Sequence, residues 1–304
     1  MTLLLTRLYR WWRTRQTATV VNGAPKGAVS LPRVDSDRPS AAARGPLALL
    51  VHEARYALLA SWRNPRARFF TFIFPILLLV IFAGVFGSGN TTTIDGHRVS
   101  VSTYFVGGIL ALSIISAAYA NLVMSVATAR ETGILKRRRA TPVPPPILVA
   151  GQALATLVIA VVMTTILLII ARAGYSVAIP AGALAAMAAA VVIGTVSFAC
   201  LGYAVAGLIG SPDSAQPIIQ LTLMPLYFIS GVWIPSASLS HTLRSIASAF
   251  PVEHLAASMH NATIYGSFAS AISPSDLLVL AAWGVGAVAF AARRFSWLPS
   301  AATA

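Results

Sequence analysis

Long stretches without charged side chains alternate with short basic segments along this chain. Six windows of 16 to 29 residues contain no Asp, Glu, Lys or Arg. A helix of about 20 apolar residues crosses a hydrocarbon core of roughly 30 Å. The pattern therefore predicts an all-α polytopic membrane protein with six transmembrane helices. The expected helices cover residues 69–86, 104–128, 147–171, 181–209, 218–234 and 277–292.

Two other segments have mixed polarity. Residues 47–62 place charged side chains among Leu and Ala, which predicts an N-terminal interfacial helix that ends at Asn64-Pro65. Residues 235–274 are too apolar for a plain loop and too polar for a lipid-facing span. We expect short re-entrant or interfacial helices there, on the outer side.

Basic residues set the expected orientation. Of the 22 Lys and Arg residues, twelve precede the first expected span, five lie between residues 130 and 139, and two follow the last span. Cytoplasmic loops carry most of the Lys and Arg of a membrane protein, so both termini and the 130–139 loop are expected in the cytoplasm. The net charge of +14 is also typical of nucleic-acid binding, but these residues flank apolar spans and no nucleic-acid-binding motif is present.

Several kinds of chemistry find no support in the sequence. Cys200 is the single cysteine, which excludes an intramolecular disulfide. Lys26 and Lys136 are the only lysines and neither lies in a P-loop, so we expect no nucleotide hydrolysis on this chain. The outer-side His241, His254 and His260 with Glu253 fit no zinc motif, and no metal or cofactor is expected on this chain.

Four motifs occur in a consistent order between about residues 47 and 294. They are Arg63-Asn64-Pro65-Arg66 with the following Phe72-Ile73-Phe74-Pro75-Ile76, the run from Arg130 to Pro142, Phe228-Ile229-Ser230-Gly231-Val232-Trp233-Ile234-Pro235, and Phe250-Pro251. Together they resemble the permease subunits of ABC-2-type exporters, in particular the daunorubicin-resistance-like group. Two features depart from that pattern: the linker 17–46 is long, and Val252-Glu253-His254 replaces residues that are usually uncharged.

The resemblance implies an architecture and partners. It implies six helices with cytoplasmic ends in a bacterial cytoplasmic membrane, and a re-entrant outer helical hairpin before the sixth helix. It also implies a second permease copy or paralogue, two cytoplasmic ABC ATPase subunits that carry ATP and Mg, and contact with membrane lipids. The expected domains are a basic tail with a flexible linker (1–46), an ABC-2-type transmembrane domain (47–294) and a short cytoplasmic tail (295–304).

The basic loop between the second and third expected helices is the candidate contact with the ATPase. Four consecutive cations cannot lie inside a bilayer, where each costs about 2.5–3.5 kcal/mol at a helix centre. From the residues alone, the loop is either a docking helix with Ile134 and Leu135 as apolar contacts or an anchor on lipid headgroups; the resemblance favours docking. The prolines that follow predict a stiff connector to the third helix, although a proline-rich partner motif has the same composition. The candidate coupling residues are Arg130, Glu131, Gly133, Ile134, Leu135, Lys136, Arg137, Arg138, Arg139, Thr141 and Pro142.

The resemblance also favours the second and fifth helices as the lining of a substrate pathway. Aromatic and Met side chains on these helices suit an amphipathic substrate. The alternative is that the same residues simply pack within the permease. The candidate residues are Asn121, Met124, Met224, Tyr227, Phe228, Ser230 and Gly231.

The function favoured by the sequence is export of an amphipathic drug or lipid-like molecule, powered by a separate ATPase. A secondary transporter or channel that needs no ATPase is the main alternative. Coupling to protons or sodium often uses ionisable residues inside the membrane, and the six expected span cores contain no Asp, Glu, Lys or Arg. A noncatalytic membrane scaffold is a third interpretation.

Overall fold

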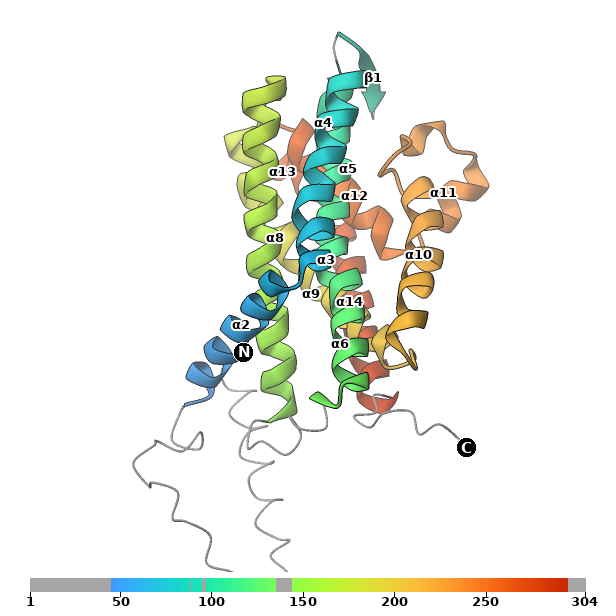
Figure 1. Cartoon of the computed structure of the whole chain (residues 1–304). Helices are drawn as coiled ribbons and strands as arrows, with labels where there is room; N and C mark the ends of the chain where they lie inside the picture. Colours follow the sequence, from blue (N-terminus) through green and yellow to red (C-terminus); the bar gives the residue numbers. More distant parts are fainter. Residues whose placement is uncertain (1–44, 88, 95–96, 135–143, 295–304) are drawn as a thin grey trace, which may run out of the picture.

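The computed structural model describes residues 45–87, 89–94, 97–134 and 144–294. Within these ranges the regular structure is helical apart from one short β-hairpin. The axes of most of the long helices are roughly aligned with one another (Figure 1). Two π-helical segments, η3 and η4, interrupt otherwise continuous helices. The elements are α2 (Pro46–Arg63), α3 (Pro65–Arg68), η3 (Phe69–Ile73), α4 (Phe74–Phe86), β1 (Thr91–Ile94), β2 (His97–Ser100), α5 (Val101–Ile115), η4 (Ser116–Ala120), α6 (Asn121–Glu131), α8 (Pro145–Tyr175), η5 (Ala181–Ala183), α9 (Leu184–Ala206), α10 (Pro212–Ile229), η6 (Ser236–Ser238), α11 (His241–Ala247), α12 (Pro251–Ile264), α13 (Phe268–Ala271) and α14 (Pro274–Arg294).

Five helical segments of the described chain are long and apolar enough to cross a membrane. They confirm the first four and the sixth of the expected spans. The fifth expected span, 218–234, was wrong at both ends, because α10 covers Pro212–Ile229. Asp213, Gln216 and Gln220 make α10 more polar than the other five. It ends before Gly231, whose φ of +76° turns the chain out of the helical conformation.

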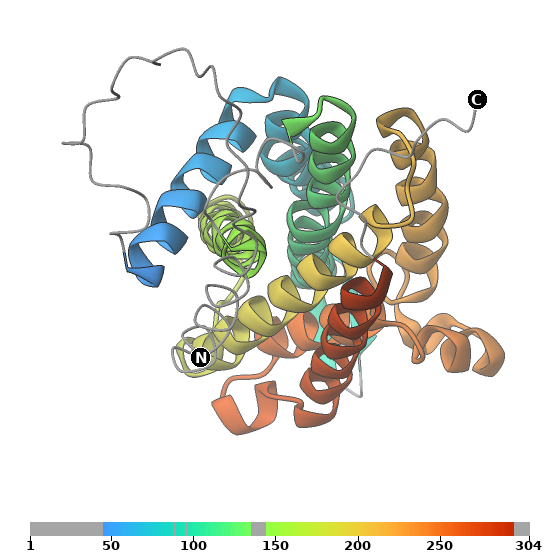
Figure 2. The same ribbon diagram turned by 90° about the horizontal axis from the view of Figure 1, so that it is seen from below.

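The segment α5–η4–α6 lies at the centre of the helical bundle (Figure 2). In its most apolar window 72% of the residues are buried, against 22% for η3–α4 and 17% for α14. The peripheral helices η3–α4 and α14 therefore present broad apolar surfaces, as expected of helices that face lipid.

Helix α2 crosses α8 obliquely (Figures 1 and 2). Leu49, Ala54 and Ala57 form its buried face, and the approach is close, because a Cβ atom at Gly151 of α8 would lie 2.6 Å from the Cβ atom of Glu53. The expected helix over 47–62 and its end at Asn64-Pro65 are confirmed. The Asn64 side-chain oxygen accepts a hydrogen bond from the Ala67 backbone N–H, which caps the next helix.

The hairpin β1–β2 was not predicted. Its two antiparallel strands pair Thr91 with Ser100 and Ile94 with His97. Four-residue strands between two spans give too short an alternation for a sequence pattern to detect. Of the expected tails 1–46 and 295–304, residues 1–44 and 295–304 lie outside the described residues.

Three helices, α11, α12 and α13, connect α10 to α14, and we call them the outer helices. They lie in the half of the molecule that also holds β1–β2 (Figure 1). Helix α12 is mostly buried and packs against α5, α9 and α14. Residues 235–274 thus hold a series of short helices, as the mixed polarity of this segment predicted.

Candidate functional site

A large cavity lies along one side of the central helix α5–η4–α6. It encloses about 1430 Å³ and is lined by residues of α2, α3, η3, α4, α8 and α10 as well as the central helix. Its volume is large for a small-molecule site. The walls combine Phe, Leu, Ile and Met side chains with uncharged polar groups, a composition that suits an amphipathic molecule.

The cavity brings together most of the pathway residues that the sequence suggested. Asn121 and Met124 line it from α6, and Met224, Tyr227 and Phe228 line it from α10. Residues three and four apart share one face of a helix, which explains why each helix contributes neighbouring positions.

Ser230 and Gly231 do not line the cavity. Both are buried in the turn that follows α10. The Tyr104 hydroxyl and His260 Nε2 both donate hydrogen bonds to the Gly231 carbonyl oxygen, the latter at 3.1 Å. The rings of Tyr104 and His260 stack with their centroids 4.6 Å apart. These two residues therefore fix the end of α10, where the sequence had suggested a lining position.

The cavity also has polar residues that the sequence analysis missed. Ser125 lies one turn after Asn121 on α6, and Gln216 and Gln220 lie one turn apart on α10. Polar residues at four-residue spacing within an apolar helix were the available signal. Asp213 is the one Asp, Glu, Lys, Arg or His among the described cavity-lining residues.

The two π-helical segments meet beside the cavity. The side-chain amide of Asn121, which directly follows η4, donates a hydrogen bond to the hydroxyl of Thr71 in η3, and Thr71 is fully buried. Single-turn π-helices widen a helix locally and often occur at functional sites. This bond joins the first and second membrane helices at the level of the cavity.

Arg130 at the end of α6 is turned inward. Its side chain is 4% exposed, and Nη1 donates a 2.8 Å hydrogen bond to the carbonyl oxygen of Ile209 in the α9–α10 connection. It is therefore a structural link between α6 and the start of α10, whereas the sequence had grouped it with the surface of the basic loop.

The described part of the basic loop is exposed. Glu131 is the last residue of α6, Gly133 follows with a φ of +70°, and the Ile134 side chain is 44% exposed. An exposed Ile at this position is available to a partner. The other coupling residues, Leu135, Lys136, Arg137, Arg138, Arg139, Thr141 and Pro142, lie outside the described residues.

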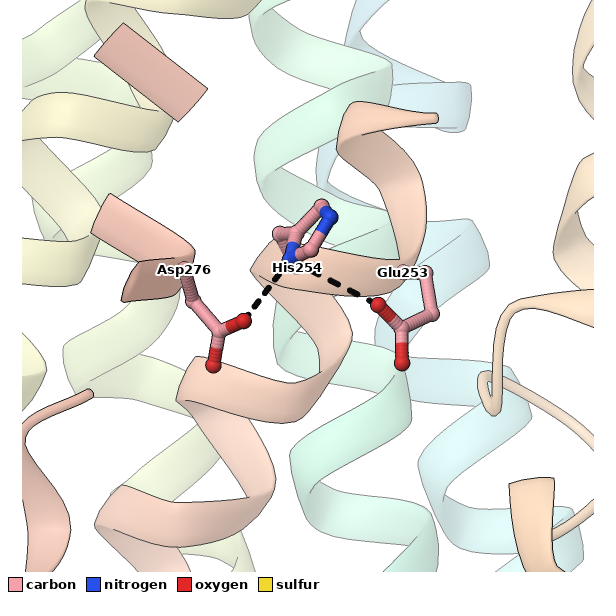
Figure 3. A group of neighbouring side chains, drawn as sticks. All are labelled: Glu253, His254 and Asp276. Atoms are coloured by element: carbon pink, nitrogen blue, oxygen red, sulfur yellow. Dashed lines mark hydrogen bonds and ion pairs between the residues drawn. The ribbon is translucent and has the colours of Figure 1, made fainter. Parts of the chain in front are cut away.

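A second polar group occurs among the outer helices, where Glu253 and His254 of α12 meet Asp276 of α14 (Figure 3). His254 Nδ1 lies 2.7 Å from Asp276 Oδ1 and 3.6 Å from Glu253 Oε2. Its Nε2 lies 2.9 Å from the carbonyl oxygen of Ser248. The hydrogen bond to Asp276 raises the pKa of His254 above its ordinary value. Burial raises the pKa of the Glu253 carboxyl, and the nearby His254 opposes this shift.

The three histidines considered together in the sequence lie in different surroundings. His254 bonds to Asp276, His260 bonds to Gly231, and His241 is the exposed first residue of α11. Asp276, which completes the polar group, comes from a different helix and was not considered in the sequence analysis.

Comparison with known proteins identifies one family. The sequence model described as "ABC-2 type transporter" matches residues 51–264, which include every cavity-lining segment and α12. A search of curated proteins found no significant match.

Proposed function

The chain belongs to the ABC-2 type transporter family, and we propose that it is the permease subunit of an exporter that moves an amphipathic drug or lipid-like molecule outward. Members of this family are membrane subunits that work with an ABC ATPase. The ATPase binds ATP and Mg, and this chain provides the route across the membrane. Within the family we place it in the daunorubicin-resistance-like group, on the motifs quoted above.

The observation that carries this proposal is the cavity. Five pathway candidates line it, and uncharged polar groups lie beside aromatic and Met side chains. A molecule with an apolar body and a polar end finds partners for both parts on these walls. A secondary transporter often has an ionisable group within the membrane. Asp213, the charged residue of the described lining, lies in the first turn of α10 rather than in its middle.

The proposed input of energy is the basic loop after α6. Closure of two ATPase subunits would move the basic loop, which begins after Glu131 and contains Ile134. Arg130 joins the base of this segment to the carbonyl oxygen of Ile209, so a displacement would reach α6 and α10 together. These two helices pack against each other, and both carry pathway residues that line the cavity.

The proposed assembly contains two permease chains and two ATPase subunits in a bacterial cytoplasmic membrane, with both termini and the basic loop in the cytoplasm. The outer helices and β1–β2 then face outward, and the outer helices are the proposed re-entrant hairpin. One side of α10 is strongly exposed and apolar, including Leu221 at 79% and Phe228 at 50%. A second permease copy or membrane lipid covers such a surface.

A cavity-filling substitution tests the route. Ser125→Trp places a large side chain on the cavity wall, and Val285→Trp places the same side chain at an exposed position of α14 outside the cavity. The probes are ethidium and a fluorescent phospholipid, followed in inside-out vesicles that contain the permease and its candidate ATPase.

We expect Ser125→Trp to lower ATP-driven uptake of the transported probe by about tenfold or more. This corresponds to an increase of about 1.4 kcal/mol in the activation free energy of the rate-limiting step. Val285→Trp should keep the wild-type rate. Equal rates for both variants, at equal protein levels and thermal stability, would place the route elsewhere.

A further inference from the structure

The side chain of His254 connects three parts of the outer region. The ring belongs to the first turn of α12, and its Nδ1 faces Asp276 near the start of α14 (Figure 3). Its Nε2 faces the Ser248 carbonyl at the end of α11. The side chains of His254 and Asp276 are 11% and 17% exposed. The contacts are therefore shielded from solvent but close enough to the surface to exchange protons.

The hydrogen-bond partners of this ring limit its possible protonation states. A backbone carbonyl oxygen and a carboxylate only accept hydrogen bonds, so both ring nitrogens of His254 must donate. A proton placed on Asp276 would also satisfy the 2.7 Å contact. It belongs on the ring, because the hydrogen bond to Asp276 raises the pKa of His254 above its ordinary value. His254 is therefore an imidazolium in this conformation.

The distances favour a proton over a metal ion. The ligand atoms of Glu253, His254 and Asp276 all lie within 4.8 Å of one another, which is compact enough for one ion. Two ligand atoms bound at about 2.1 Å to one Zn²⁺ at the tetrahedral angle lie about 3.4 Å apart. The 2.7 Å separation of Nδ1 and Oδ1 is shorter and is typical of a charge-assisted hydrogen bond.

The charged groups that face the ring are Glu253 of α12 and Asp276 of α14. Within the described residues, the α11 end contributes the Ser248 carbonyl, and no Lys or Arg forms an ion pair with the cluster. Helices α5, α9 and α10 also pack against α12, and their ionisable side chains lie outside the three ring contacts with Asp276, Glu253 and Ser248. These side chains are Tyr104, Cys200, Tyr203, Asp213 and Tyr227.

Helix α12 also holds the turn after α10. Two turns beyond His254, His260 bonds the Gly231 carbonyl oxygen together with Tyr104. A helix attached at its first turn to α14 and at its other end to the turn after α10 cannot shift without breaking one of these contacts. The first contact depends on a proton, since a neutral ring can donate from one nitrogen only.

We propose that His254 is a proton-dependent clamp whose charged ring holds α12 against α14 and the end of α11, so that loss of the proton loosens the outer helices and alters transport. The clamp concerns this chain alone, whereas its effect on transport rests on the proposed function. The stabilisation is complete below the ordinary His pKa of about 6.5 and is lost as pH rises through the higher pKa of the folded state.

Thermal unfolding of the purified full chain between pH 6 and pH 9, with and without EDTA, tests the clamp. The variants are His254→Gln, and His241→Gln as the matched exposed control. We expect the melting temperature of wild type and His241→Gln to fall across this range by at least about 2 °C more than that of His254→Gln. Equal pH dependence in wild type and His254→Gln, or a melting temperature that EDTA lowers, would overturn the proposal.

Asp276→Asn keeps the size of the side chain and covers the case in which His254→Gln does not fold. Without the carboxylate the pKa of His254 should drop, so the fall in melting temperature should begin at a lower pH than in wild type. An unchanged onset would contradict the clamp.

Transport in the vesicles described above, with the internal pH varied, separates the two proposals. We expect the pH dependence of ATP-driven uptake to differ between wild type and His254→Gln. An identical dependence overturns the role in transport. ATP-driven uptake that is absent in wild type would refute the proposed function, while the melting data would still decide the clamp.

Discussion

Gly108 lies where α5 passes closest to the turn after α10. A Cβ atom at this position would lie 2.3 Å from the carbonyl oxygen of Val232, and one at the adjacent Gly107 would lie 2.4 Å from His260 Nδ1. Backbone atoms cannot move aside as a flexible side chain can. The two glycines thus allow α5 to contact both the turn and α12, which positions the Tyr104 and His260 hydrogen bonds.

We expect Gly108→Ala to destabilise the protein by about 1–3 kcal/mol through this overlap. Gly286→Ala is the control, because Gly286 lies within α14 and its added Cβ would meet nothing within 4 Å. That change should be neutral or stabilising, since Ala has the higher helix propensity. Melting temperatures measured in the same detergent compare the two, and a control that loses as much stability as Gly108→Ala would refute the steric explanation.

Single residues were predictable from the sequence where helix periodicity placed them. Asn121 and Met124 face the cavity because they share one face of α6. Gly231 does not line it, because the chain leaves the helix there with a positive φ. The His254–Asp276 pair joins positions 22 residues apart on different helices. No local pattern indicates such a contact, so it required the structure.

At the scale of elements, the hydropathy pattern located the long helices, the helix over 47–62 and the helical character of 235–274. The five most apolar spans were correct to within a few residues, because burial in lipid requires long uninterrupted apolar stretches. The bounds of α10 were wrong, since Gln216, Gln220 and two prolines obscure a helix that packs partly against protein. The π-helical segments depend on backbone hydrogen-bond register, which composition does not reveal.

The contact between α6 and the α9–α10 connection gives a prediction at this scale. Arg130→Lys keeps the charge but loses the planar, longer guanidinium that reaches the Ile209 carbonyl oxygen. We expect a loss of about 1–2 kcal/mol in stability, because a buried carbonyl loses a charged donor. Exposed Arg172→Lys on α8 is the control.

Transport provides the second readout for this contact. If Arg130 transmits motion from the basic loop to α10, Arg130→Lys should lower ATP-driven uptake under conditions where the variant remains folded. Uptake at the wild-type rate in a folded Arg130→Lys protein would show that α6 and α10 move together without this bond.

At the scale of the whole molecule, the features lie in order along the direction of the helices. The exposed Ile134 follows α6 at one end, the cavity runs along η4, α6 and α10, and the His254 cluster lies among the outer helices. Arg130 connects the first of these regions to the cavity walls, and the Gly231 turn connects the walls to α12. The fold therefore provides a continuous physical connection from the proposed ATPase contact to the outer helices.

The dependence of transport on a separate ATPase is the central claim. The direct measurement is uptake of the probe into vesicles that contain the permease, with and without the candidate ATPase and ATP, for wild type, Ile134→Asp and the conservative control Ile134→Val. We expect uptake only when both ATPase and ATP are present. Ile134→Asp should reduce it by about tenfold, because a charge in an apolar contact costs more than about 1.4 kcal/mol, while Ile134→Val keeps the wild-type rate. Uptake by the wild-type permease that continues without the ATPase or without ATP would contradict the account.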